Sequence, residues 1–409
     1  MVFKKGGNNM FNTINEAIED IKNGKPIVVV DDEDRENEGD LFIPAEAASE
    51  EMINFMIKEA RGLMCVPITK ERAEKLCLNY MTEDNTDNHG TAFTVSVDSF
   101  EGTTTGISVL DRLKTIKDLA DDSMKEGSFR KPGHIFPLIA KENGVLERKG
   151  HTEAAVDLSR LAGFKEVGVI IEILNDDGKM ARRDDLLDFC QNHDLKIITI
   201  EDLILYRKVN EKLVKSEVRT KLPTKYGDFE IVAYSDKIEE KEYVVIIKGD
   251  IQNKEKISVR LHSECLTGDV FGSKRCDCGE QLERALVEIE ERGEGILIYL
   301  RQEGRGIGLI NKLKAYNLQE QGYDTVEANH QLGFNDDLRD YAVAAQIIKD
   351  LGIKSVSIMT NNPLKISGLE KYGIKVLERE ELEILSNGID KEYLKTKKEK
   401  MGHIFNQDL

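Results

Sequence analysis

The sequence predicts a mixed α/β (α+β) protein of two domains, each a mixed sheet with packed helices. The chain has 409 residues, which exceeds what one hydrophobic core usually supports. In both halves, apolar runs of strand length alternate with segments of helical spacing. A charged segment that contains one proline, VNEKLVKSEVRTKLPT, suits a connector. We therefore expect domains at residues 1–208 and 209–409.

In the first half, INEAIEDIKNGK and EMINFMIKEA have helical spacing, and PIVVVDD between them is a run typical of a buried strand. HTEAAVDLSRLAGF predicts a helix with Thr152 as its cap, and EVGVIIEIL predicts a buried strand after it. The stretch from Ala181 to Lys208 predicts a helix, a strand and a last helix.

The second half opens with the short strands YGDFEIVAYSD, KEYVVIIKGD and KISVRLHS. Strand–helix alternation follows around GILIYLRQ, DLRDYAVAAQIIKDLGI and SVSIMTNNP. The tail YLKTKKEKMGHIFNQDL is strongly charged, and we expect it to be exposed or partly disordered.

Composition limits the function classes. The net charge of −18 argues against general binding to nucleic acid or anionic membranes, so a polyanionic ligand would need a local basic pocket. No apolar run reaches about 18 residues, and the opening stretch lacks the apolar core of a secretory signal. Six cysteines in so long a chain are not a disulfide framework. We expect a cytoplasmic protein with a metal site.

Three of the six cysteines, Cys265, Cys276 and Cys278, lie close together in the sequence. They could be isolated core residues, or part of a structural zinc site completed by a distant ligand such as His262 or His330. Catalytic zinc sites instead keep three protein ligands and leave one position open, where zinc lowers the pKa of bound water towards 7. The spacing alone leaves these alternatives open.

The motifs around the cysteines are VRLHSECLTGD, CGEQLERAL, YLRQEGRGIGL, DTVEANHQLGFNDDLRDYA and MTNNPLKISGL. Together they resemble GTP cyclohydrolase II over nearly all of the second half. The resemblance implies opening of the imidazole ring of GTP, with release of formate and pyrophosphate. It implies zinc at the three cysteines, Asp337 as proton acceptor and Arg339 as nucleophile towards the α-phosphorus. The implied GTP contacts are Arg260, Leu261, His262, Ser263, Glu264, Gln281, Glu303, Gly304, Arg305, Thr325, Thr360 and Lys365.

Elementary chemistry qualifies two of these roles. A guanidinium is effectively always protonated, so charge stabilisation of the leaving phosphates is a competing interpretation of Arg339. Asp337 and Arg339 would diverge on a helix, so we expect one of them at a helix start; an exposed helical ion pair is the alternative. The glycine-rich turn from Gly304 to Gly308 lets backbone N–H groups approach phosphate.

In the segment VVVDDEDRENEGD of the first half, seven carboxylates and one arginine follow directly after an apolar run. It could be a solvated loop, but a few carboxylates beside a buried strand also suit Mg²⁺. If the segment stays extended, Glu36, Glu38 and Asp40 share one face. His134 in KPGHIFPL, His151 at a helix start and Glu172 inside an apolar strand add chemistry to this half, although each alone could be structural.

These residues, with RGLMCVPIT, TAFTVSVD and TTTGIS, resemble 3,4-dihydroxy-2-butanone 4-phosphate synthase from Phe11 to about Arg207. The resemblance implies conversion of D-ribulose 5-phosphate to the four-carbon phosphate and formate with Mg²⁺ or Mn²⁺, through enolisation, dehydration and a skeletal shift. It implies metal binding by Glu36 and His151, essential roles for His134 and Glu172, and Glu38 and Cys65 close by. The implied substrate contacts are Arg35, Glu36, Asp40, Arg148, Lys149, Gly150, His151, Thr152 and Glu172.

Both halves thus resemble entry enzymes of riboflavin biosynthesis, in a known fused order, and the families lead us to expect a homodimer with small-molecule substrates. Two other functions stay open. The second half could be a guanine-nucleotide-binding regulatory module with structural zinc, and the first could be a sugar-phosphate isomerase. A nucleic-acid-binding zinc knuckle fits neither the acidic charge nor the three-thiol set.

Overall fold

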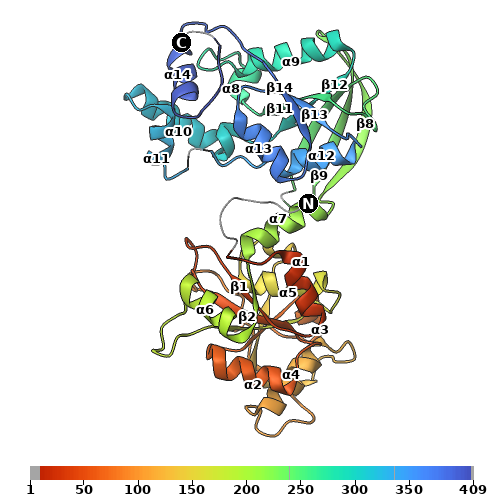
Figure 1. Ribbon diagram of the computed structural model, residues 1–409, viewed down its shortest axis with the longest axis vertical. Helices are drawn as coiled ribbons and strands as arrows, with labels where there is room; N and C mark the ends of the chain where they lie inside the picture. The colour runs from red at the N-terminus through yellow and green to blue at the C-terminus, as the bar shows by residue number, and fades with distance from the viewer. Residues whose placement is uncertain (1–9, 239, 336, 407–409) are drawn as a thin grey trace. The chain divides into compact units, whose positions relative to one another are not determined.

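The computed structural model describes residues 10–238, 240–335 and 337–406, so the opening MVFKKGGNN and the last three residues lie outside the described ranges. The chain divides into two compact units, Met1–Arg207 and Lys208–Leu409, and each is described by itself (Figure 1). Within the described ranges, none of the helices combines the length and apolar character needed to cross a lipid bilayer.

The first unit is built on a seven-stranded mixed sheet with the order β4-β5-β3-β6-β2-β1-β7. Among the described strands of this unit, only the β5–β3 and β1–β7 pairs are parallel. The strand bounds are β1 Ile27–Val30, β2 Gly39–Pro44, β3 Cys65–Ile68, β4 Val97–Ser99, β5 Phe129–Ile139, β6 Gly168–Glu172 and β7 Lys196–Thr199. The continuous apolar run of β1 is buried on both faces, as expected for an inner strand covered by helices.

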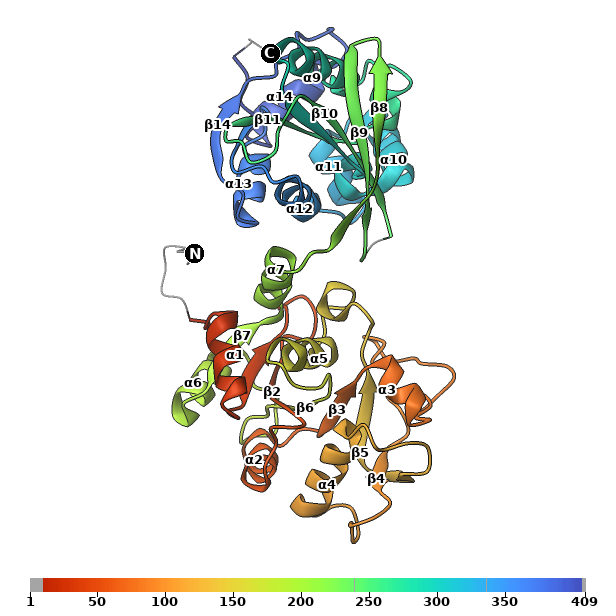
Figure 2. The same cartoon turned by 90° about the vertical axis from the view of Figure 1, so that its right-hand side faces the viewer.

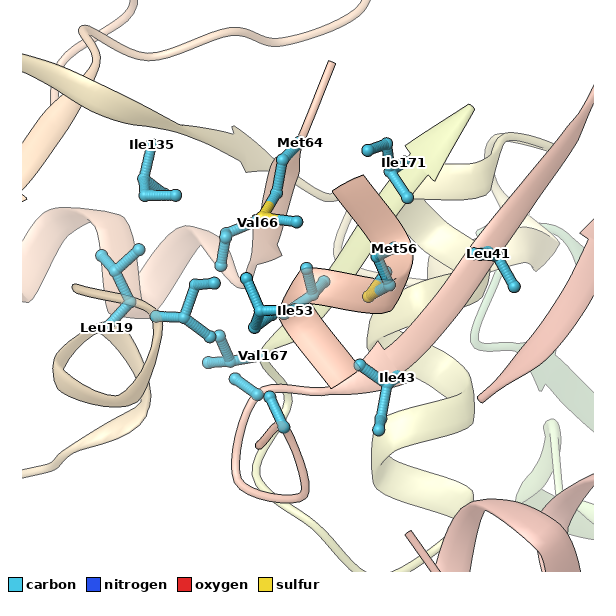
Figure 3. Packing of buried hydrophobic residues seen from close by; sticks show 14 of the residues in the cluster. Leu41, Ile43, Ile53, Met56, Met64, Val66, Leu119, Ile135, Val167 and Ile171 are labelled. Carbon is cyan, nitrogen blue, oxygen red and sulfur yellow. The ribbon is translucent and has the colours of Figure 1, made fainter. Parts of the chain in front are cut away.

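Helices cover both faces of this sheet (Figure 2). One core contains residues of α1 Ile14–Lys22, α5 His151–Leu161 and α7 Ile200–Asn210. The opposite core contains residues of α2 Glu50–Phe55, the π-helical turn Met56–Ala60, α3 Lys70–Lys75, α4 Val109–Ala120 and α6 Arg183–His193. Figure 3 shows part of the second core, where Ile53 and Met56 lie among strand side chains such as Ile43 and Val66. Helix α5 begins at His151 with Gly150 as its N-cap, so the predicted Thr152 cap is wrong.

The second unit has a seven-stranded sheet with the order β14-β13-β11-β12-β10-β9-β8. Its antiparallel part comprises β8 Val214–Thr224, β9 Gly227–Asp236, β10 Glu242–Lys248 and β12 Gly295–Leu300. β11 Ile257–Ser263, β13 Val356–Met359 and β14 Val376–Glu380 continue it in parallel from β12. The helices are α8 Leu266–Asp269, α9 Cys278–Arg292, α10 Gly308–Glu320, α11 Thr325–Gln331, α12 Ala342–Asp350, α13 Pro363–Lys371 and α14 Lys391–Glu399, with a 3₁₀ turn at Glu303–Gly306. The two mixed sheets with packed helices confirm the predicted fold class.

Two predictions about the second half are wrong. Much of the expected connector is strand β8, which pairs with β9 along its whole length. Its position at the sheet edge explains both its polar sequence and its tolerance of Pro223. The expected exposed tail forms α14 and a following segment, in which Leu394 and Phe405 are buried. Helix α14 contacts α11.

Candidate active sites

The strand register of the first unit places several predicted site residues on one line across the sheet. Val29 of β1 pairs with Asp40 of β2, and Asp40 pairs with Glu172 of β6. Beyond β6, the backbone N–H of Leu63, just ahead of β3, donates to Oε2 of Glu172 at 2.7 Å. Residues from three separate motifs therefore meet because of strand pairing.

His151 joins this line from the first turn of α5. Its Nε2 lies 3.2 Å from the carbonyl oxygen of Val29, which can only accept, so Nε2 carries the proton. Its unprotonated Nδ1 faces Oε2 of Glu36 and Oδ1 of Asp40, each at 3.9 Å. Burial lowers the pKa of His151, although nearby Asp31 opposes this. A neutral imidazole with a free nitrogen is the form that binds a metal.

The structure brings Asp31, Glu36 and His151 together, with one ligand atom from each within 4.8 Å of the others. Asp31 also folds the loop, because its carboxylate accepts hydrogen bonds from the backbone N–H groups of Glu36 at 3.1 Å and Glu38 at 2.9 Å. The extended conformation considered for this segment is wrong, since a turn precedes Asn37, which has a φ of 55°. Asp31 was not predicted from the sequence, because nothing in the acidic run separates it from the six other carboxylates.

Asp40 shows that the cluster suits a cation. Its carboxylate is buried, and its Oδ1 has no hydrogen-bond partner among the described residues. Burial, followed by the charges of Glu172 and Glu36, raises the pKa of Asp40 well above its usual value. Burial and Glu36 likewise raise the pKa of Glu38. A divalent ion would offset this concentration of negative charge, so the residues present fit a bound Mg²⁺ or Mn²⁺.

His134 has a partner that the sequence did not indicate. Its Nδ1 lies 2.7 Å from Oδ2 of Asp98, and its backbone N–H donates to Oδ1 of the same residue. Gly106 packs against the pair so closely that a Cβ there would lie 2.1 Å from Asp98 and 2.4 Å from His134. The loop that carries Gly106 is held by Asp111, which accepts from the N–H of Gly106 at 3.0 Å.

The remaining predicted residues of this half surround the same helix start. Arg35 forms ion pairs with Asp31 and Glu36, each at 2.9 Å. Arg148 pairs with the buried Glu153 at 2.7 Å, which fixes its guanidinium beside α5. Lys149 is exposed and Thr152 is buried. Gly150, where a Cβ would collide with Arg148, completes the turn, and Cys65 is buried in β3.

In the second unit the three predicted thiols converge. Cys265 precedes α8, and Cys276 and Cys278 lie at the start of α9. The sulfurs lie within 4.8 Å of one another, with 3.7 Å between Cys265 and Cys276. Two sulfurs held tetrahedrally at about 2.3 Å from one zinc ion would lie roughly 3.8 Å apart. The donor set therefore fits zinc.

The considered fourth ligands lie elsewhere. Among the described residues, no histidine or carboxylate joins the three sulfurs within 4.8 Å. His262 instead contacts Asp269 through Nε2 at 3.0 Å, and His330 is exposed on α11. Lys312, which sequence reasoning missed, lies against the cluster, with Nζ 3.0 Å from the sulfur of Cys265 and 2.7 Å from Oε1 of Glu303.

A pocket opens beside the sulfurs, and its lining is strongly basic. In the part of the chain that the structure describes, seven arginine and lysine side chains line it, against only two carboxylates, Glu264 and Glu303. These basic residues are Arg260, Arg275, Arg305, Lys312, Arg339, Lys365 and Lys397. This is the local basic pocket that a polyanionic ligand would need on a chain with a net charge of −18.

The predicted GTP contacts are largely brought together in this pocket. Eleven of the twelve line it, namely Arg260, His262, Ser263, Glu264, Gln281, Glu303, Gly304, Arg305, Thr325, Thr360 and Lys365. Leu261 does not line it; its side chain is buried and its carbonyl accepts from Nζ of Lys365 at 2.7 Å. Burial, reinforced by Arg260, lowers the pKa of Lys365 well below its usual value.

Asp337 and Arg339 form an ion pair, with Nε of Arg339 2.8 Å from Oδ1 of Asp337. Both side chains are largely buried, and both residues precede α12 in an irregular segment. The expectation of a helix start at one of them, and the alternative of an exposed helical pair, are therefore wrong. Burial opposes ionisation, yet the hydrogen bonds between them lower the pKa of Asp337 and raise that of Arg339.

Comparison with known proteins shows which families the two units match. The family model described as 3,4-dihydroxy-2-butanone 4-phosphate synthase matches residues 15–206, and that of GTP cyclohydrolase II matches residues 215–381. A riboflavin biosynthesis protein RibBA of Bacillus cereus is 56% identical over 97% of this chain and all of its own length. The RibBA protein of Endomicrobium trichonymphae is 55% identical over 97% of this chain and 98% of its own.

A solved structure is similar over both units. It is that of RibBX, a two-domain 3,4-dihydroxy-2-butanone 4-phosphate synthase from A. baumannii. The identity is 34%, the TM-score is 0.66, and the match covers 90% of this chain and 99% of that one.

Proposed function

The chain belongs to the family of bifunctional riboflavin biosynthesis proteins that join a 3,4-dihydroxy-2-butanone 4-phosphate synthase to a GTP cyclohydrolase II, and on this premise we propose that each half holds one complete active site. The first half acts on D-ribulose 5-phosphate and the second on GTP. We assign the two catalytic domains to residues 1–208 and 209–409.

In the first half, Glu36 and His151 hold Mg²⁺ or Mn²⁺, and the position of Asp31 supports it as a third ligand. The bound ion would stabilise negative charge on the sugar oxygens next to the carbonyl. His134 moves protons at Nε2, because its Nδ1 is committed to Asp98. Glu172, one strand away from the uncompensated Asp40, is the second group placed to exchange protons with the substrate. The helix start at Gly150 and Arg148 holds the phosphate.

In the second half, Cys265, Cys276 and Cys278 hold zinc, which would supply Lewis acidity beside the purine ring. The cations of the basic pocket bind the triphosphate. Asp337 accepts a proton as a carboxylate, since Arg339 keeps it ionised. Arg339 stabilises charge on the phosphates rather than attacking phosphorus, because its pairing with Asp337 holds it protonated.

One observation carries the proposal for this half: a three-sulfur cluster, with no fourth His, Asp or Glu ligand among the described residues, borders a pocket lined by seven arginine and lysine side chains. A regulatory module with structural zinc would use a fourth protein ligand and would bind GTP without turnover. A position left open to a reactant is what hydrolysis requires.

The experiment is to supply each substrate separately to the purified full-length chain, and to measure formate, released pyrophosphate and bound metal. We expect formate from both substrates and about one zinc per chain. GTP binding without formate would contradict the cyclohydrolase proposal. A five-carbon product from ribulose 5-phosphate would indicate the rival isomerase. The homodimer rests on the family resemblance, and the mass in solution tests it.

A further inference from the structure

The C-terminal segment contributes one wall of the basic pocket. It follows residue 381, where the match to the cyclohydrolase family model ends, yet Tyr393, Lys397 and His403 all line the pocket. Two of its later residues are held in place, since the N–H of Ile404 donates to the carbonyl oxygen of Asn361 at 2.9 Å and Phe405 is buried. The segment is therefore part of the site and not an appendage to it.

Lys397 makes the most telling contact of this wall. Its Nζ lies 2.7 Å from Oδ1 of Asp277, which stands between the two thiols Cys276 and Cys278. Lys397 is 8% exposed and Asp277 is 1% exposed. Burying an ion pair removes the hydration of both ions, so such a pair is weak evidence of a purely stabilising role. Its position inside the thiol loop points to a role in the site.

The pair continues into the residues that face the nucleotide. The other oxygen of Asp277 accepts from Nε2 of Gln281 at 2.6 Å, and Oε1 of Gln281 accepts from Nη2 of Arg260 at 2.6 Å. Arg260 in turn donates to the carbonyl oxygen of Met359 at 2.9 Å. A continuous chain of hydrogen bonds thus joins α14 to the thiol loop and to two predicted GTP contacts.

We propose that Lys397 is a positioning residue of the cyclohydrolase site, which acts through Asp277 to fix the zinc-binding loop and to orient Gln281 and Arg260 towards the nucleotide. This inference rests on the proposed function of the second half. Without Lys397, the Asp277 carboxylate is buried, unpaired and next to the negative charge of the sulfurs. It then withdraws from Gln281 or displaces the loop, and both the metal and the nucleotide are held less well.

The test uses the full-length chain with Lys397→Met, and with Lys395→Met as a control on an exposed position of the same helix. Loss of a group that supports metal ligands typically weakens metal binding by roughly 10- to 100-fold. We expect zinc to pass to a chromophoric chelator about tenfold faster or more from Lys397→Met, and the KM for GTP to rise. Formate from ribulose 5-phosphate reports on the integrity of the chain and should not change. Lys397→Arg should restore part of the zinc retention.

A double variant separates positioning through Asp277 from a merely structural contact. If Lys397 acts through Asp277, removing both charges in Lys397→Met/Asp277→Asn should recover zinc retention relative to Lys397→Met alone. Additive losses would overturn the proposal, as would zinc release and KM values of Lys397→Met equal to those of Lys395→Met. If Lys397→Met does not fold, the double variant, which lacks the unpaired buried charge, is compared with Asp277→Asn instead. Equal zinc retention in these two variants supports the proposal, because Lys397 then has no effect once Asp277 is uncharged. Weaker zinc retention in the double variant overturns it. The wild-type chain is the reference for the proposed function. If it retains zinc and releases formate from GTP, a negative result with the variants counts against the role of Lys397 alone. If it does neither, the proposed function itself fails.

Discussion

Nδ1 of His134 lies 2.7 Å from Oδ2 of Asp98, and the other oxygen of that carboxylate accepts from the His134 backbone N–H. The carboxylate fixes both the orientation and the tautomer of the ring, because only a protonated Nδ1 can donate to it. Nε2 is then the nitrogen left for the substrate. Under the proposed function, Asp98 would thus set which form of His134 meets ribulose 5-phosphate.

Asp98→Asn should therefore lower kcat for ribulose 5-phosphate by roughly 10²-fold, because an amide can present its N–H to the ring and favour the wrong tautomer. The assay is formate release from ribulose 5-phosphate, with formate from GTP as the control on the same preparation. An unchanged kcat would show that the pair has no part in the reaction.

Cys276→Ser and His151→Ala should have reciprocal effects. Cys276→Ser removes one sulfur of the cluster and should abolish formate release from GTP while sparing that from ribulose 5-phosphate. His151→Ala should do the reverse. Each group lies in its own compact unit, so we expect each substitution to act on the metal-binding residues of that unit. Loss of both activities in either variant, with an intact unfolding transition, would contradict independent sites.

Substitutions of Arg339 distinguish its two interpreted roles. If it stabilises phosphate charge, Arg339→Lys should keep part of the activity towards GTP, because the charge remains. Arg339→Gln should lose about 10²–10³-fold in kcat. Pyrophosphate and formate release should fall together in single-turnover experiments. Equal and complete loss in both variants would argue against a purely electrostatic role.

Asp111 gives a prediction about pH. Hydrogen bonds from the side chain of Thr104, then from backbone N–H groups, lower its pKa from 3.8 to about 2. A carboxyl group whose pKa is lower in the folded state than in the unfolded state stabilises the fold. This contribution is complete at pH values above the unfolded-state pKa, and it is lost as the pH falls from about 4 to 2. Asp111→Asn should therefore lower the urea midpoint of the first unit at pH 7. The difference from wild type should shrink as the pH falls below 4, and a constant difference would refute this account.

The motifs, and the family resemblances that they carry, predicted many of the residues that the structure brings together at both candidate sites. The three thiols converge because a short helix and the start of α9 carry them. Asp98 was not predictable in this way, because it meets His134 only through the pairing of β4 with β5. Lys312 and Lys397 were missed for the same reason, since their partners lie on distant elements.

The acidic run shows a different limit. Glu36 and Asp40 do lie near His151, as their motifs implied, but the reason considered for it was wrong. An extended strand would have aligned them, whereas a turn stabilised by Asp31 does so here. Alternation along a sequence cannot reveal a carboxylate that folds its own loop. The prediction of an exposed charged tail was wrong for a related reason. The sequence does not distinguish a lysine buried against a carboxylate, such as Lys397, from a lysine in solvent.

The way the C-terminal segment packs has a practical consequence for handling this protein. Phe405 is buried, and the backbone N–H of Ile404 donates to the carbonyl oxygen of Asn361. Deletion of these two residues would remove contacts that anchor the segment carrying Tyr393, Lys397 and His403 to the basic pocket. Truncated variants of this protein should therefore retain Ile404 and Phe405.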